Sequence, residues 1–144
     1  MDVVTRKVAL LLVVGSVCLF LPKATKAQAC QDDESMVTAN TKDLSDSVAQ
    51  VRKESLDDFV KEFHQKSITV RLSLSSGMFQ EVVDCFNKAA KDATATKEQA
   101  DAYKAKSAAY AKLKTKVDGA VKSLKSATDP KQAKALIEKL DFST

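Results

Sequence analysis

A seven-residue repeat of apolar side chains between residues 96 and 126 constrains the fold more than any other feature of this sequence. Its members are Tyr103, Tyr110, Val117 and Leu124. Such a repeat lies along one side of a helix, and that side needs an apolar partner surface. Thr96 and Gln99 have the spacing of a capping box, in which two side chains satisfy free backbone donors at a helix start. The sequence therefore predicts one long helix over residues 97–126.

Apolar residues at three- and four-residue spacings predict three further helices, over residues 41–74, 77–92 and 130–141. Asp129-Pro130 offers a cap and a first-turn proline for the last of them. Residues 68–74 also alternate between apolar and polar, which is typical of a strand. Helix is favoured there because a single strand would have no partner in this chain.

Composition agrees with a helical chain, since the sequence has three glycines, two prolines and no tryptophan. We expect an all-α fold, a small three- or four-helix antiparallel bundle within residues 41–144. Residues 28–40 are mostly polar and include three consecutive acidic residues, Asp32 to Glu34. This segment is predicted to be an extended acidic arm.

The first residues resemble a secretory signal peptide. Arg6 and Lys7 precede an apolar run over residues 8–21, and small residues follow that suit cleavage after Ala27 or, alternatively, after Ala29. The apolar run is shorter than the roughly 20 residues that span a bilayer. We expect residues 1–27 to be removed, leaving a secreted, extracellular chain with no stable membrane span.

Two cysteines, Cys30 and Cys85, remain after the predicted signal peptide. In an exported protein this predicts one disulfide, which would tie the arm to the helical domain. Two alternatives stay open: Cys85 could be a buried thiol, and Cys30 could pair between two chains.

Catalytic and metal-binding motifs are not found in the sequence. His64 is the only histidine, too few for a zinc site, and it is predicted to lie at the surface. Asp32 to Glu34 lack the alternation and the glycine of a calcium loop. The lysines of residues 97–126 are interleaved with acidic residues, so we expect a solvated face and no nucleic-acid binding. We expect that the protein is not an enzyme and that it binds neither a metal ion nor a cofactor.

Two functions fit these observations. The leading hypothesis is a non-enzymatic extracellular protein that acts through protein–protein interaction or in a structural role, with an unknown partner. The alternative is a carrier of a lipid or another small apolar ligand. It rests on bulky aromatic residues that face many alanines and could line a cavity: Phe59, Phe63, Phe79, Phe86, Tyr103 and Tyr110.

Self-association is a further expectation, because the seven-residue repeat is long enough for coiled-coil pairing. Residues 28–95 are acidic and residues 96–144 are basic, which favours an antiparallel or head-to-tail neighbour. Lys106 occupies a core position of the repeat and weakens such a pairing. We therefore expect the repeat to pack within the monomer, with weak dimerisation at most.

Overall fold

The structure, a computed structural model, describes residues 26–143, which form five helices and no strand. The helices are α1 (Lys26–Val51), α2 (Leu56–Lys61), α3 (His64–Ala90), α4 (Lys97–Ser126) and α5 (Pro130–Glu138). The predicted all-α fold is confirmed. The predicted signal peptide lies almost wholly outside the described residues.

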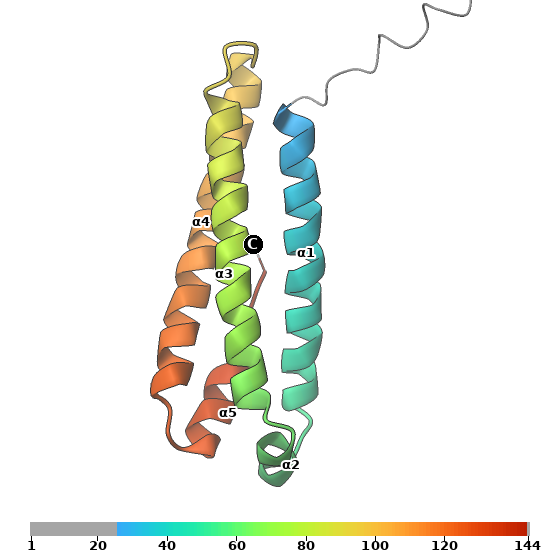
Figure 1. Ribbon diagram of the computed structural model, residues 1–144, viewed down its shortest axis with the longest axis vertical. Helices are drawn as coiled ribbons and strands as arrows, with labels where there is room; N and C mark the ends of the chain where they lie inside the picture. Colours follow the sequence, from blue (N-terminus) through green and yellow to red (C-terminus); the bar gives the residue numbers. More distant parts are fainter. Residues whose placement is uncertain (1–25, 144) are drawn as a thin grey trace, which may run out of the picture.

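Three long helices lie side by side along the longest axis, with α3 between α1 and α4 (Figure 1). Each runs antiparallel to its neighbour, and α2 and α5 lie together at the lower end in this view (Figure 1). Because α3 contacts both other long helices, it carries much of the buried surface.

One cluster of apolar side chains from all five helices forms the core. Val117 and Leu124 of the seven-residue repeat are buried in it. Leu113, one helical turn before Val117, is buried there too. Tyr103 and Tyr110 pack against the same cluster. The repeat thus finds its partner surface within the monomer. The largest fully buried side chains are Phe59, Phe79, Phe86, Leu44, Ile68, Leu72 and Ile137.

The expected extended arm at residues 28–40 is instead the beginning of α1. Cys30 and Val37 are buried there, and with Leu44 and Val51 they form a second seven-residue repeat that faces α3. The polar residues between them are exposed or half-buried on the other sides of the helix. Burial of one side is enough to keep a polar segment helical.

The helix expected over residues 41–74 is interrupted twice. It ends at Val51, and α2 and α3 follow as separate helices. Ser55 ends the first interruption by capping α2: its Oγ accepts the Asp58 backbone N–H at 3.1 Å. At the second interruption Phe63 adopts a left-handed conformation, with φ 52° and ψ 31°, which turns the chain into α3.

Residues 68–77 are continuous helix within α3, so the strand alternative was wrong. The expected separation of the helices over residues 41–74 and 77–92 was wrong too. Ser75 is buried in the helix interior, where its hydroxyl lies 2.8 Å from both Arg71 O and Asn40 Oδ1 of α1. These contacts stabilise Ser75 in a helix, although serine favours turns in isolation.

The first residues of the last two helices follow sequence signals. Thr96 and Gln99 form the complete capping box of α4, and Asp129 caps α5, whose first residue is Pro130. Past α5, the Arg52 guanidinium donates to the backbone oxygens of Glu138 and Leu140. This holds the last residues against the core, where Phe142 packs.

Candidate functional site

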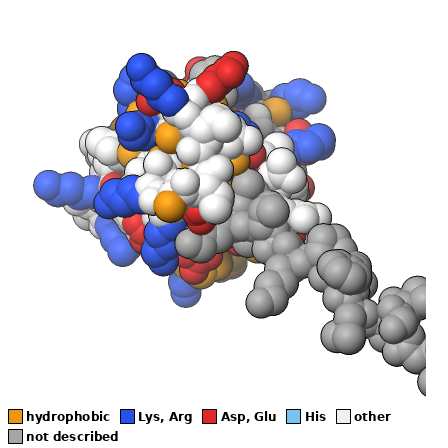
Figure 2. All heavy atoms as spheres, turned by 90° about the horizontal axis from the view of Figure 1, so that it is seen from above, with side chains coloured by type: hydrophobic (Ala, Val, Ile, Leu, Met, Phe, Trp, Pro, Cys, Tyr) orange, Lys and Arg blue, Asp and Glu red, His pale blue; other side chains and the backbone are white. Residues whose placement is uncertain are grey.

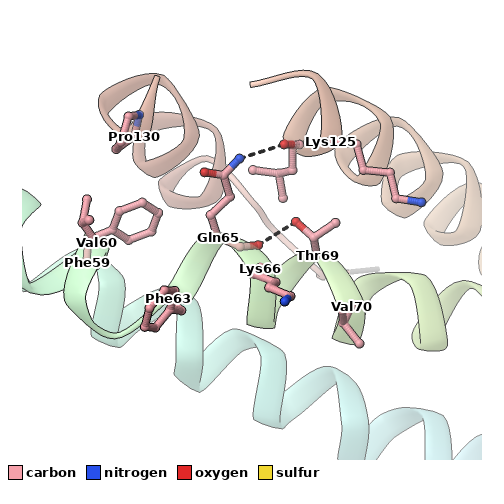
Figure 3. Close-up of a pocket in the computed structure, with 10 residues that line it drawn as sticks. Phe59, Val60, Phe63, Gln65, Lys66, Thr69, Val70, Lys125 and Pro130 are labelled. Atoms are coloured by element: carbon pink, nitrogen blue, oxygen red, sulfur yellow. Dashed lines mark hydrogen bonds between the residues drawn. The ribbon is translucent and has the colours of Figure 1, made fainter. Parts of the chain in front are cut away.

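An apolar hollow of about 400 Å³ opens where α2, the first turns of α3, the end of α4 and the start of α5 meet (Figure 3). A volume of this size falls within the range of small-molecule sites. The lining residues are Phe59, Val60, Phe63, Gln65, Lys66, Thr69, Val70, Leu124, Lys125 and Pro130.

The wall of the hollow contains apolar side chains that remain exposed. The exposed fraction is 47% for Val60, 73% for Phe63 and 53% for Val70. Phe59, by contrast, is 1% exposed and belongs to the core beneath. Leu74, one helical turn beyond Val70, is 63% exposed but does not line the hollow. Exposed apolar side chains gathered in a concave surface mark a binding site more often than scattered ones do.

Phe63 shapes the hollow through its backbone. The left-handed conformation costs a non-glycine residue about 1–2 kcal/mol, and here a large aromatic residue adopts it. The same conformation directs α3 away from α2 and leaves the Phe63 ring in solvent. Strain of this kind persists only where the surrounding structure holds it, and it is concentrated at functional sites.

Gln65 joins the two halves of the hollow. Its Nε2 donates to Leu124 O at 2.9 Å (Figure 3). It also donates to Ala127 O at 2.9 Å, and so satisfies carbonyls at the end of α4. The Thr69 hydroxyl donates to Gln65 O at 2.6 Å. The donor hydrogens of both side chains are therefore engaged within the protein.

Lysines supply the remaining polar groups of the hollow. Lys66 comes from the first turns of α3 and Lys125 from the last turn of α4 (Figure 3). Both side chains are exposed, and neither has an ion-pair partner among the described residues. No aspartate or glutamate is among the lining residues.

His64 was expected at the surface, but its side chain is only 17% exposed. Its Nε2 lies 2.9 Å from Oε2 of Glu54, whose side chain is 15% exposed. Neither atom forms a well-aligned hydrogen bond with another described residue, so the two face only each other. The imidazole also stacks on Phe59, with ring centroids 6.0 Å apart. The pair therefore fixes α2 beside the hollow without lining it.

The six aromatic residues that the sequence grouped as a ligand lining lie in two places. Phe59 and Phe63 border the hollow. The other four stack between α3 and α4 further along the bundle. Phe86 lies 5.9 Å from Tyr103 and 6.4 Å from Tyr110, and Phe79 lies 6.2 Å from Tyr110, all between ring centroids.

Glu34 of α1 connects this stack to α1. Its carboxylate accepts the Tyr110 hydroxyl at 2.9 Å and the Lys106 ammonium at 2.7 Å. Burial, followed by the hydrogen bond to the Glu34 carboxylate, raises the pKa of Tyr110 to about 12. Lys106 also lies 5.2 Å above the Phe86 ring. A lysine at a core position of the repeat is thus accommodated by a carboxylate and a ring face.

The two cysteines lie together: the Sγ atoms of Cys30 and Cys85 are 1.99 Å apart, at bonding distance. They link the first turns of α1 to the last turns of α3. The start of α1 lies at the end of the bundle away from α2 and α5 (Figure 1). The predicted pairing within one chain is confirmed. Within residues 26–143 no group of histidine, cysteine, aspartate and glutamate side chains could hold a metal ion.

The end of the bundle opposite the hollow presents a mixed surface. Seen from above, Lys and Arg side chains stand around its edge with acidic side chains among them, and apolar atoms are scattered singly (Figure 2). Mixed charges of this kind are typical of a solvated surface. The hollow at the other end differs from it because its charged lining residues are all lysines.

The hollow itself was not predicted from the sequence, although Phe59 and Phe63 belong to the predicted ligand lining. No described helix has the length and apolarity needed to cross a bilayer. Comparisons of the chain with known protein families, with curated proteins and with solved structures find no match.

Proposed function

We propose that the chain is a secreted, non-enzymatic helical protein that binds a small apolar ligand in the hollow between α2, α3 and α4. The observation that carries this proposal is a concave wall of half-exposed apolar side chains with a volume of about 400 Å³. An apolar ligand would cover Val60, Phe63 and Val70 and so remove their surface from water.

Support for an extracellular role comes from two other features. The first residues have the composition of a secretory signal peptide. The bonded cysteine pair suits an oxidising compartment, since such bonds persist outside the cytosol.

A neutral single-chain alcohol tests ligand binding. We expect 1-octanol to shift backbone amide resonances in residues 59–70 and 124–130 of the ¹⁵N-labelled chain, and few others. Val70→Asn should weaken the binding about fivefold, the equivalent of about 1 kcal/mol of lost apolar burial. Leu74→Asn is the matched control, because Leu74 lies one turn along the same helix and outside the hollow. The absence of localised shifts would contradict the proposal.

Protein–protein interaction is the second candidate function, and one observation favours it specifically. Leu74 continues the exposed apolar surface beyond the hollow, with 63% of its surface exposed. A partner protein would cover both Val70 and Leu74, whereas a small ligand in the hollow would cover Val70 and leave Leu74 exposed. Equal loss of partner or self-association by Val70→Asn and Leu74→Asn, measured by sedimentation equilibrium at low and moderate salt, would support this second function.

A further inference from the structure

We infer that the ligand of the hollow is an anionic amphiphile, a single apolar chain that ends in a carboxylate, with Lys66 and Lys125 as the residues that bind the charged end. This inference rests on the proposed ligand-binding function and adds the chemical class of the ligand. It depends on which polar groups of the hollow are free.

Most polar groups in the lining are already engaged. The Gln65 amide donates to two backbone carbonyls of α4 and the following turn, and the Thr69 hydroxyl donates to the Gln65 carbonyl. Pro130 has no backbone N–H to offer. The lysine ammonium groups are therefore the free side-chain donors among the lining residues, and they are donors only. A ligand that binds to these free donors must bring an acceptor.

The charges of the lining residues indicate that this acceptor is an anion. Two lysines that have no ion-pair partner within residues 26–143 line the hollow, and none of its lining residues is acidic. Asp129 adjoins Pro130, but its carboxylate accepts the Lys131 backbone N–H at 3.0 Å at the start of α5. The charged side chains in the lining, which are both lysines, thus favour a negative group at the edge of the hollow.

The arrangement of apolar and charged residues matches an amphiphile. Phe63, Val60 and Val70 form an apolar wall, while the lysines come from two different helices on its border (Figure 3). A lysine side chain has a flexible four-carbon stem, so each ammonium can follow a carboxylate at the water boundary. The apolar chain of the ligand would then lie against the wall, with its charged end in partial contact with solvent.

Three ligands with the same eight-carbon chain test the charged end: octanoate, 1-octanol and octyltrimethylammonium. Each is titrated below its micelle concentration into the ¹⁵N-labelled full chain, and shifts of residues 59–70 and 124–130 are followed. We expect octanoate to bind most tightly and the cation most weakly. The double variant Lys66→Gln/Lys125→Gln should weaken octanoate binding about tenfold, as expected for two partly exposed ion pairs, and leave 1-octanol binding unchanged.

A second pair of lysines provides the control for net charge. Lys88→Gln/Lys91→Gln removes the same charge from exposed positions at the other end of α3. We expect this variant to keep the preference for octanoate. Equal affinities for the three ligands, or a preference that survives in the Lys66/Lys125 variant, would overturn the anionic class and leave ligand binding intact. Failure of all three ligands to bind would overturn both proposals, and a dimer abolished by Val70→Asn would then assign the hollow to a second copy of the chain.

Discussion

Glu54 and His64 stand at the two ends of α2 and face each other directly, with Oε2 and Nε2 2.9 Å apart. The six-residue helix between them is too short to be stable without tertiary contacts. The contact between Glu54 and His64 holds the segments on either side of α2 together, and the stacking of His64 on Phe59 adds a second contact. The shape of the hollow therefore depends on a contact that does not line it.

Removing one partner of this pair should destabilise the protein. Glu54→Ala leaves Nε2 of His64 without its neighbour, and a largely buried unpaired polar atom costs about 1–3 kcal/mol. Urea unfolding followed by circular dichroism measures the loss, with Glu62→Ala as the exposed control. In the double variant Glu54→Ala/His64→Ala, the loss should be smaller than the sum of the single losses. Additive losses would show that the pair does not interact.

Phe63→Asn should stabilise the chain by about 1 kcal/mol, because asparagine tolerates the left-handed conformation that phenylalanine adopts under strain. Little burial is lost, since 73% of the Phe63 side chain is exposed. Phe63→Leu keeps both the strain and an apolar side chain, so its stability should stay near that of the unmodified chain. The same asparagine variant should bind 1-octanol more weakly. Thermal unfolding measures the change in stability, and titration with 1-octanol measures the change in binding. If Phe63→Asn were less stable than the unmodified chain, the claim that Phe63 is strained would be contradicted.

The pair Cys30–Cys85 closes a loop with a sequence separation of 55 residues. The chain-entropy relation for a loop of this length gives about 4 kcal/mol of stabilisation. Cys30→Ser/Cys85→Ser should lower the free energy of unfolding by about this amount, measured in urea. Hydrogen exchange should increase first in α1. Before this comparison, the intact mass of the unreduced chain after alkylation shows whether the bond is present. Alkylation of both Cys30 and Cys85 in the unreduced chain would exclude the bond.

Stability should fall in alkaline solution because of Tyr110. Its pKa of about 12 in the folded chain lies above the value of about 10 in an unfolded chain. A pKa raised by folding means that the neutral form is favoured, so its stabilisation is complete below pH 10 and is lost as the pH rises toward 12.

The Tyr110→Phe variant should show a smaller fall of the urea midpoint between pH 9 and pH 11 than the unmodified chain. Tyr103→Phe is the matched control, since both tyrosines belong to the same aromatic stack. Lysines titrate in the same range in every variant, and the comparison between variants cancels their contribution. Identical pH profiles for Tyr110→Phe and the unmodified chain would refute the assignment.

Much of the fold followed from local sequence patterns. The repeat that ends at Leu124, together with the Thr96–Gln99 box, predicted α4 because both signals lie within one helix. The repeat of α1 has a weak sequence signal because five of the six residues between Cys30 and Val37 are polar. Ser55 and Asp58 have capping spacing, but the continuous apolar pattern around them favoured one uninterrupted helix.

The hollow could not be predicted, for a different reason. Leu124 and Pro130 are more than fifty residues from Phe63, and only the packing of α4 against α3 brings them together. The left-handed conformation of Phe63 has no local signal either, because phenylalanine is not a residue that favours it.

The cysteine pair also determines how this chain would respond to mechanical force. Tension applied between residues 26 and 143 passes through the bond from Cys30 to Cys85 and bypasses α2 and most of α1 and α3. Only the segment beyond Cys85, with α4 and α5, could then be pulled out, which corresponds to roughly 200 Å of extended chain. The part of the hollow formed by α2 and α3 lies inside the shielded loop, and the part from α4 and α5 lies outside it. Stretching would therefore open the hollow by removing one wall while the other stays covalently enclosed.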